Sequence, residues 1–567
     1  LARLPPARAS GLSSDARLVE PMRLLGLLLL ISASPAASAG PVVDLTQPAA
    51  EFQHFWKRCV GTGHMLLGTR ADWQRHLLRA RDELGFTGIR GHGLLDDDMS
   101  VMPRRGEYEF FNVDTVFDFL VSAKIKPVVE LSFMPLALAR CAPANCSYAF
   151  NNHGAYKGLT MPPKDFLEWG ELIRVLAQHL VDRYGLEEVA TWRFEVWNEL
   201  WGMDFPRPYM DLYASSAKAL KAVSPKLRVG GPATMQVLHV EDFVNAARAA
   251  ELPVDFVSTH LYPTDPECPP GDVHCFTRLI HEARDLVRER TGAEFLITEY
   301  NAGLGLRDGL DLDAPFAAAF AFRQIAAIEG VDMFSWWTFT DIFEEQWMQS
   351  KPFQNGFGLQ TIHGVPKPAW RAFQLLKEAG SWRARVSGAS PQTPNASLSV
   401  LATVDAQTEG RELQLFVADW SPAGTTRYSC GAAGVCAEDE RGAYTDEALC
   451  NAQCGGGRQL SDAVRTISID IRHGKEGLLG GGEVAMSLAR IDDEHGNAKT
   501  AWTAMGSPGY LNGRQIDALV AASQLVEERG RVERVDAETS RVTVALPPWS
   551  ALRVLLRASR VQRSLLL

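Results

Sequence analysis

Short apolar runs typical of β-strands alternate with amphipathic helical stretches from about residue 55 to residue 380. Helical stretches such as ADWQRHLLRARDEL place apolar residues three and four positions apart, on one helix face. The strand candidates lie near residues 60, 86, 126, 192, 227, 255, 294 and 332. Eight strand and helix repeats predict an α/β fold, a (β/α)₈ TIM barrel. A doubly wound sheet is the alternative, but no G-x-G-x-x-G follows the first strand.

The sequence pattern changes after about residue 385. Helical periodicity fades there, and the segments RELQLFVADW, VRTISIDIR, RVTVALP and ALRVLLR alternate apolar and polar residues between Gly- and Pro-bearing turns. This pattern predicts an antiparallel β-sandwich. We therefore expect an upstream segment and signal peptide at 1–39, a barrel at 40–384, and a β-sandwich at 385–567 with a Cys-rich insert at 430–454.

The first 39 residues have the features of a secretory signal. Met22 and Arg23 precede an apolar run at 24–31, and the small residues Ala37, Ser38 and Ala39 form an A-x-A cleavage pattern. A membrane anchor is the alternative, but the run is much shorter than the roughly 20 residues that a spanning helix needs. The sequence therefore predicts a secreted protein with no stable membrane span.

Charge and composition restrict the partners. The 567 residues are 46% hydrophobic, enough for more than one core, and the formal net charge is −11. This balance gives no basic surface for a nucleic acid. We expect a small-molecule or polymeric ligand; the oligomeric state stays open.

Cysteine usage agrees with an oxidising compartment. Eight of the nine cysteines fall into close groups: Cys141 with Cys146, Cys268 with Cys275, and Cys430, Cys436, Cys450 and Cys454 together. These groups predict local disulfides. A zinc site is the alternative for the last four, although none forms a C-x-x-C. Cys59 is predicted to be a buried free thiol, and Asn145 and Asn395 begin N-x-[ST] sequons compatible with glycosylation.

Polar residues follow the strand candidates where a barrel carries its catalytic groups, at the C-terminal ends of the strands. They are Arg90, His92, Glu130, Asn198, Glu199, His260, Tyr262, Glu299, Trp336, Trp337, Thr338, Asp341, Glu344 and Glu345. Such convergence favours a functional site. For Arg90 and Glu130, a buried ion pair that only supports the fold is an equal possibility.

Two of these carboxylates end the fourth and seventh strands, across the barrel mouth from one another. Glu199 and Glu299 are close enough in this arrangement for a sugar to lie between them. Glycoside hydrolysis needs one carboxyl that protonates the leaving oxygen and another that attacks the anomeric carbon or activates water. Asn198, beside Glu199, could donate to a sugar hydroxyl. No metal-binding signature accompanies the pair.

Aromatic and polar residues near the strand ends suit the same ligand. Core packing is the alternative for each tryptophan. The candidates for stacking on a sugar ring are Trp197, Trp336, Trp337 and Trp347, and those for binding its hydroxyls are His92, His260, Glu344 and Glu345.

Several long motifs in order resemble glycoside hydrolase family 39, and its β-xylosidases more than its α-L-iduronidases. They are GFTGIRGHGLLDDDM, RYGLEEVATWRFEVWNE, LRVGGPAT, PVDFVSTHLYPT, ITEYN, SWWTFTDIFEE, GFGLQTIHGVPKPAW and, in the predicted sandwich, ARIDDEHGNAKTAWTAMGSP. The resemblance implies a barrel with an attached β-sandwich and a retaining double displacement without a cofactor. It implies that Glu199 is the acid/base and Glu299 the nucleophile.

The resemblance also implies a set of sugar-binding residues, with the choice between Glu344 and Glu345 open. The set is His92, Asn198, His260, Tyr262, Trp337 and Glu344. Leu200 and Trp201 depart from the family, which usually has Pro after Asn-Glu, and the Cys-rich insert is foreign to the bacterial xylosidases. An iduronidase-like enzyme is the closest rival function, and a catalytically inactive carbohydrate-binding protein is a rival of another class.

Overall fold

The structure is a computed structural model. It describes residues 40–142, 145–149, 158–269, 272–305, 310–345, 351–388, 397–405, 412–420, 428–430, 436–438, 464–474 and 483–558. The predicted signal peptide, the sequon at Asn395, Trp347 and most of the Cys-rich insert lie outside these residues. No helix in the described ranges combines the length and the apolar character needed to cross a bilayer.

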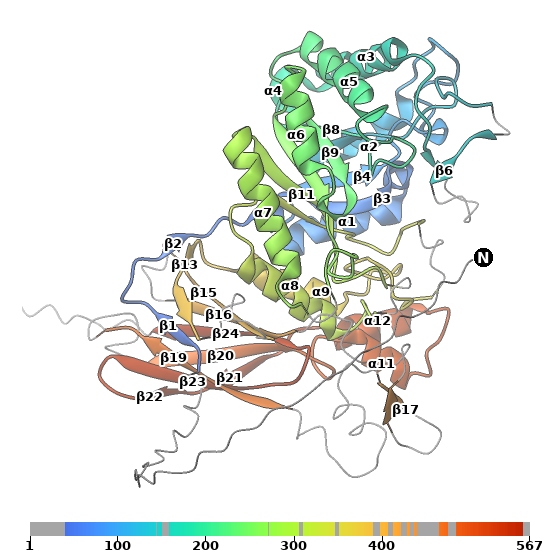
Figure 1. Ribbon diagram of the computed structural model, residues 1–567. Helices are drawn as coiled ribbons and strands as arrows, with labels where there is room; N and C mark the ends of the chain where they lie inside the picture. The colour runs from blue at the N-terminus through green and yellow to red at the C-terminus, as the bar shows by residue number, and fades with distance from the viewer. Residues whose placement is uncertain are drawn as a thin grey trace, which may run out of the picture. The chain divides into compact units, whose positions relative to one another are not determined.

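Eight parallel strands close into a barrel in the order β10-β11-β12-β3-β4-β5-β8-β9 (Figure 1). Their side chains are mostly buried, because a barrel strand faces packed side chains on one side and helices on the other. The strands are β3 (Val60–His64), β4 (Gly88–His92), β5 (Lys126–Leu131), β8 (Arg193–Val196), β9 (Arg228–Thr234), β10 (Phe256–His260), β11 (Glu294–Tyr300) and β12 (Met333–Trp336). The predicted TIM barrel is confirmed, and each strand coincides with a predicted run.

Amphipathic helices follow the barrel strands. In α1 (Ala71–Leu84) the buried residues Trp73, Leu77, Ala80 and Leu84 recur at spacings of three and four. The other helices are α2 (Phe111–Ser122), α3 (Phe166–Tyr184), α4 (Leu186–Val189), α5 (Tyr209–Val223), α6 (Val240–Ala249), α7 (Cys275–Arg290), α8 (Pro315–Ala327) and α9 (Pro368–Lys377). Short 3₁₀ helices are η1 (Phe55–Arg58), η2 (Met65–Thr69), η3 (Asp97–Met99) and η6 (Met235–Val237).

Two sheets form the β-sandwich. Valine, leucine and isoleucine side chains of both sheets make one buried core, with Val400 and Val554 from the first sheet and Ile469 and Val542 from the second. The first sheet has the order β2 (Ala50–Glu51), β13 (Trp382–Arg383), β15 (Leu398–Val404), β16 (Glu412–Asp419), β24 (Ala551–Ala558), β20 (Val484–Ile491) and β21 (Glu527–Gly530). The second has the order β14 (Arg385–Ser387), β1 (Val42–Asp44), β19 (Arg465–Arg472), β23 (Thr539–Leu546) and β22 (Val532–Arg534). Two small ribbons pair β6 (Tyr148–Ala149) with β7 (Gly158–Leu159) and β17 (Tyr428–Cys430) with β18 (Cys436–Glu438).

The sandwich differs from the sequence expectation in three details. β1 and β2 lie within the segment 40–384 that the sequence assigned to the barrel, yet they pair in the sandwich sheets. β1 runs parallel to β19, so its sheet is mixed, although the other sandwich pairings are antiparallel. Two helices, α11 (Ala498–Ala504) and α12 (Gly513–Ala522), follow β20, where fading helical periodicity predicted strands alone. Side-chain caps from Asn497 and Asn512 begin these helices.

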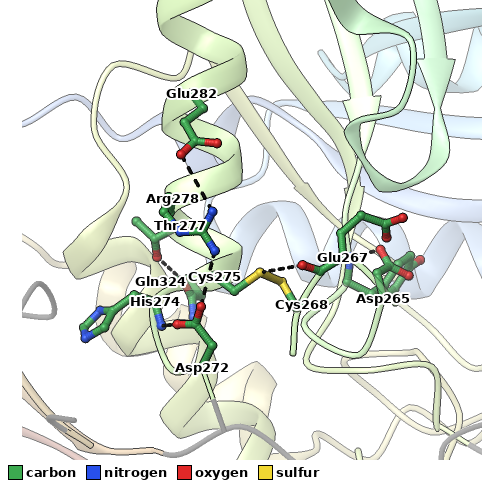
Figure 2. Close-up of a disulfide and its surroundings, with 11 residues drawn as sticks. Asp265, Glu267, Cys268, Asp272, His274, Cys275, Thr277, Arg278, Glu282 and Gln324 are labelled. Atoms are coloured by element: carbon green, nitrogen blue, oxygen red, sulfur yellow. Dashed lines mark hydrogen bonds and ion pairs between the residues drawn. A yellow bond between two sulfur atoms is a disulfide. The ribbon is translucent and has the colours of Figure 1, made fainter. Parts of the chain in front are cut away.

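Two predicted disulfides are present, Cys141–Cys146 and Cys268–Cys275, and Cys59 is a buried free cysteine as predicted. The Cys268–Cys275 bond joins the loop after β10 to the first residue of α7 (Figure 2). The side chains of Cys430, Cys436, Cys450 and Cys454 lie outside the described part of the chain.

Candidate active site

The barrel brings Glu199 and Glu299 together around one histidine. His260 Nδ1 lies 2.9 Å from Glu199 Oε1 and 3.5 Å from Glu299 Oε2. One oxygen of each carboxylate and one ring nitrogen of His260 all lie within 4.8 Å of one another. The two carboxylates follow β8 and end β11, and the space between them is therefore small enough for both to touch one substrate bond.

Glu199 sits on a strained turn directly after β8. Trp197, Glu199 and Leu200 have φ angles of 71°, 50° and 54°, a region that non-glycine residues rarely adopt. The backbone N–H of Glu199 donates to Ala233 O at 2.8 Å, which holds the turn against the neighbouring strand β9. Strain of this kind persists only where the surroundings fix the chain, and it is common at functional sites.

Glu299 lies among several polar side chains. Tyr262 Oη donates to its Oε1 at 2.5 Å, and Arg90 Nη1 lies 3.3 Å from its Oε2. Burial raises the pKa of Glu299 to about 7, because the loss of hydration and the nearby Glu199 outweigh the attraction of Arg90. Burial and the Glu299 charge raise the pKa of Tyr262 well above its usual value, so its hydroxyl keeps the proton that it donates.

The loop that carries Tyr262 is held at two points. The backbone N–H of Tyr262 donates to Asp265 Oδ2 at 2.7 Å. Three residues further, the disulfide from Cys268 anchors the loop to α7 (Figure 2). These contacts restrict the position of the hydroxyl that meets Glu299.

Arg90 connects the carboxylates beneath the site. Its fully buried guanidinium lies 2.6 Å from Glu195 and 2.8 Å from Glu130, in addition to Glu299. Burial alone would lower the pKa of Arg90, but these carboxylates raise it, so the side chain stays charged. The pairing of Arg90 with Glu130 thus belongs to the site as well as to the core. Glu195 was missed by the sequence reasoning, because a glutamate within an apolar strand carries no sign of its direction.

His92 lies on the other side of Glu130. Its Nδ1 is 2.9 Å from Glu130 and its Nε2 is 3.1 Å from Glu345. Burial would lower its pKa, but the charges of Glu130 and Glu345 and the hydrogen bonds with them raise it well above the usual value. His260 differs, because burial lowers its pKa to about 4 and leaves it neutral at neutral pH.

The buried polar atoms near the carboxylates that have no hydrogen-bond partner in the described structure include Asn198 Nδ2 and His260 Nε2. The amide oxygen of Asn198 accepts from Arg90 at 2.7 Å, so its NH₂ group is oriented by that bond. Buried unpaired polar atoms are costly, and a ligand hydroxyl would satisfy them.

A pocket of about 350 Å³, mouth included, opens above these groups, and we call it the carboxylate pocket. It is lined by His92, Asn198, Glu199, Trp201, Tyr262, Glu299, Leu304, Trp337, Glu345 and Phe357. Of the predicted sugar-binding residues, His92, Asn198, Tyr262 and Trp337 lie in this wall, and His260 lies next to it, bonded to Glu199.

Glu344 does not line the carboxylate pocket. Its Oε1 accepts a hydrogen bond from the backbone of His64 at 2.8 Å, whereas its neighbour Glu345 lies in the wall and pairs with His92. Of the two candidates left open by the sequence, Glu345 lies in the pocket wall and Glu344 does not. Adjacent residues outside a regular element point in directions that the sequence does not reveal.

The predicted stacking tryptophans also include both pocket residues and core residues. Trp337 packs on His92 with ring centroids 4.7 Å apart and lines the pocket. Trp336 packs on Phe373 and Trp197 on Phe133, so both belong to the core. Trp201, which the sequence marked only as a departure from the family pattern, is a pocket residue.

Among the residues that the structure describes, two clusters each place three possible metal-ligand atoms within 4.8 Å of one another. They are His64 with Asp96 and Asp98, and Glu199 with His260 and Glu299. Both are already paired internally. The two aspartates raise the pKa of His64 to about 10 against the opposing effect of burial, so a protonated imidazole balances their charge. The contacts of the second trio suit proton transfer and nucleophilic attack.

A family model for glycosyl hydrolases family 39 matches residues 42–412. The chain belongs to this family. It is therefore an O-glycosyl hydrolase, and its substrate is a carbohydrate.

Individual relatives of this glycosyl hydrolase agree with the family. A β-xylosidase from Caldicellulosiruptor saccharolyticus is 35% identical over 503 residues, which cover 84% of this chain and 89% of the relative. The crystal structure of a monomeric β-xylosidase from Caulobacter crescentus CB15 superposes with a TM-score of 0.71 at 25% identity, covering 92% of this chain and 99% of that one. An α-L-iduronidase from Canis lupus familiaris is 29% identical over 230 residues, 37% of this chain and 32% of the relative.

Proposed function

We propose that this family 39 enzyme is a retaining β-xylosidase that releases xylose from β-xylosides or xylo-oligosaccharides by double displacement. The observation that carries the mechanism is the close approach of Glu199 and Glu299, whose nearest oxygens lie within 4.8 Å. Retaining glycosidases have carboxyl groups roughly 5–5.5 Å apart, whereas inverting enzymes need about 6.5–9.5 Å to admit a water. The relatives described as β-xylosidases support the choice of sugar.

In the first step, Glu199 donates its proton to the glycosidic oxygen while Glu299 attacks the anomeric carbon. The bond to the leaving group breaks, and an ester between the sugar and Glu299 forms. Tyr262 and Arg90 hold the attacking carboxylate in position until its charge is lost to the ester. Asn198, oriented by Arg90, donates to a hydroxyl of the bound sugar.

In the second step, Glu199 accepts a proton from water, and the water oxygen attacks the anomeric carbon. The ester to Glu299 breaks, xylose leaves with its β-configuration, and both carboxyls return to their first state. While Glu299 is esterified, it no longer repels the negative charge of Glu199, so Glu199 is free to act as a base.

The residues that line the carboxylate pocket help to distinguish a xyloside from the rival substrate, an iduronide. A uronic acid needs a cationic partner for its carboxylate. The described wall residues include no Lys or Arg, and the protonated His92 in the wall is already paired with Glu130 and Glu345. Arg90 beneath them already contacts Glu130, Glu195 and Glu299. This arrangement favours a neutral pentose over an iduronide.

The test is a panel of nitrophenyl glycosides that includes β-D-xyloside and α-L-iduronide. We expect wild type to cleave the β-xyloside, Glu299→Ala to be inactive, and azide to restore activity to Glu199→Ala with a β-xylosyl azide product. Glu109→Ala, at an exposed glutamate, is the matched control and should behave as wild type. A folded wild type that cleaves no glycoside in the panel would favour the inactive carbohydrate-binding protein.

We further propose that the protein is exported. The support is the signal-like segment 22–39, and the measurement is the N-terminal sequence of protein recovered from the medium after expression of the full chain. A first residue near Gly40 is expected, whereas a retained segment 22–39 would refute export by cleavage.

A further inference from the structure

A second pocket adjoins the carboxylate pocket at Glu199. It holds about 580 Å³, mouth included, and shares Glu199 and Trp201 with the first pocket. Its other lining residues are Leu200, Asp204, Phe205, Thr234, Met235, Leu238 and His239. Because Glu199 borders both spaces, the oxygen that it protonates lies between them. The second pocket is therefore on the leaving-group side, and we call it the leaving-group pocket.

The walls of the leaving-group pocket come from two segments with unusual backbone conformations: the loop after β8, and the end of β9 with η6 and the residues that follow it. Seven of the thirteen non-glycine residues with positive φ in the described chain lie in these two segments. Trp197, Glu199 and Leu200 follow β8, and Ala233, Gln236, Val237 and His239 lie at the end of β9 and just after it. Each such residue costs free energy that the surrounding structure must offset. Their concentration here indicates that the shape of this pocket is fixed rather than incidental.

A glycine in the loop after β8 lies very close to a neighbouring segment of the chain. Gly202 has a φ of 68°, and a Cβ at this position would lie 1.6 Å from the backbone oxygen of Thr160. Only glycine fits so close to the neighbouring chain. This close approach places the chain directly after Leu200 and Trp201 against Thr160.

The inner surface of the pocket is mainly apolar. Leu238 is 40% exposed, although leucine is normally buried in a protein core. Phe205 stacks on His239 with centroids 5.0 Å apart and planes 16° apart, and this pair presents an aromatic surface. Leu200 and Met235 add further apolar area.

Polar partners for a second sugar are few in this wall. Thr234 is buried, and its hydroxyl is engaged with Thr259. Asp204 is the remaining acidic side chain besides Glu199 among the described lining residues. A second xylose would place its hydroxyls against leucine, methionine and phenylalanine, whereas an aromatic group would bury this apolar surface.

We propose that the leaving-group pocket binds an aromatic, apolar aglycone, so that the enzyme acts on aryl-type or arylalkyl-type xylosides in preference to xylo-oligosaccharides. The inference rests on the proposed function and adds to it the class of the leaving group. No new chemical step is involved, because the same oxygen receives the proton of Glu199.

The test compares 2-phenylethyl β-D-xyloside with xylobiose. Both leaving groups are alcohols of low acidity, and neither therefore has the chemical advantage of a nitrophenol. We expect wild type to show a kcat/KM at least about tenfold higher on the phenylethyl xyloside, as desolvation of a phenyl group in an apolar pocket predicts. β-D-Xylosyl fluoride, which has no aglycone to fill the pocket, reports on the carboxylate pocket alone.

A polar substitution in the leaving-group pocket provides the second arm. Leu238→Asn should lower kcat/KM on the phenylethyl xyloside about fivefold to tenfold and leave hydrolysis of the fluoride within about twofold of wild type. Because Leu238 is partly exposed, the variant should fold. Leu167→Asn is the matched control, since Leu167 is 81% exposed and lies on α3, outside both pockets.

The outcomes separate the two proposals. Equal or better hydrolysis of xylobiose by wild type, or a Leu238→Asn variant unchanged on the phenylethyl xyloside, would overturn the aromatic leaving group while the xylosidase assignment stands. A wild type that does not hydrolyse even the fluoride would overturn the xylosidase assignment and this inference with it.

Discussion

Replacing Glu299 by glutamine is expected to stabilise the protein at high pH while abolishing activity. The pKa of Glu299 is raised from 4.5 to about 7 in the folded protein, with burial as the main cause. Below pH 4.5 the carboxyl is neutral in both states. As the pH rises to about 7 the unfolded state ionises first, so the free energy of unfolding falls. The gap between the two pKa values corresponds to roughly 3 kcal/mol above pH 7.

Glutamine has nearly the same shape and does not ionise, so Glu299→Gln should avoid this loss. We expect it to raise the free energy of unfolding by about 3 kcal/mol at pH 8 and by little at pH 4.5, measured by urea denaturation at both pH values. Glu109→Gln, at an exposed position, serves as the control for the loss of one carboxylate. A Glu299→Gln variant less stable than wild type at pH 8 would mean that the pairing with Arg90 outweighs the cost of burial, and would refute the reasoning.

Three further predictions concern the site and its support. Tyr262→Phe removes the hydroxyl that donates to Glu299. We expect kcat/KM for a β-xyloside to fall about 10- to 100-fold and the acidic limb of its pH profile to move to higher pH. An acidic limb that stays at the wild-type pH would contradict this role of Tyr262. Lys367→Met leaves Asp313 and Asp341 buried without their shared cation, so the free energy of unfolding should fall by about 3–5 kcal/mol in urea titrations; a loss below about 1 kcal/mol would count against it. Dialysis against EDTA should change neither the hydrolysis of a β-xyloside nor the melting temperature, and loss of activity restored by a divalent cation would disprove the proposed metal-free mechanism.

The barrel was predictable from the sequence because the alternation of a strand pattern with an amphipathic helix pattern repeats eight times. The sandwich was harder. β1 and β2 have only three and two residues, too few to show a period, and they pair with strands that lie hundreds of positions away. The helices α11 and α12 follow the strand β20, and their start depends on asparagine caps that also suit turns.

The site was predictable to the level of strand ends. Glu199 and Glu299 were expected across the barrel mouth, and the structure places them there with a shared contact to His260. The sequence could not show which of Glu344 and Glu345 faces the pocket, because the segment after β12 is not a helix or strand whose regular repeat would fix side-chain directions. The role of Glu195, which lies within a strand, could not be predicted, because it depends on the ion pair with Arg90 that only the folded structure reveals.

The place of β1 has a consequence for the order of folding during synthesis. Val43 pairs with Ile471 on one side and Val386 on the other. The ribosome synthesises β1 early, and it must add more than four hundred further residues before Ile471 is available for pairing. Until then its apolar side chain and open backbone edge are exposed to other chains. The barrel strands are therefore synthesised while β1 still lacks its partners, and a version shortened after residue 384 would keep β1 without either β14 or β19.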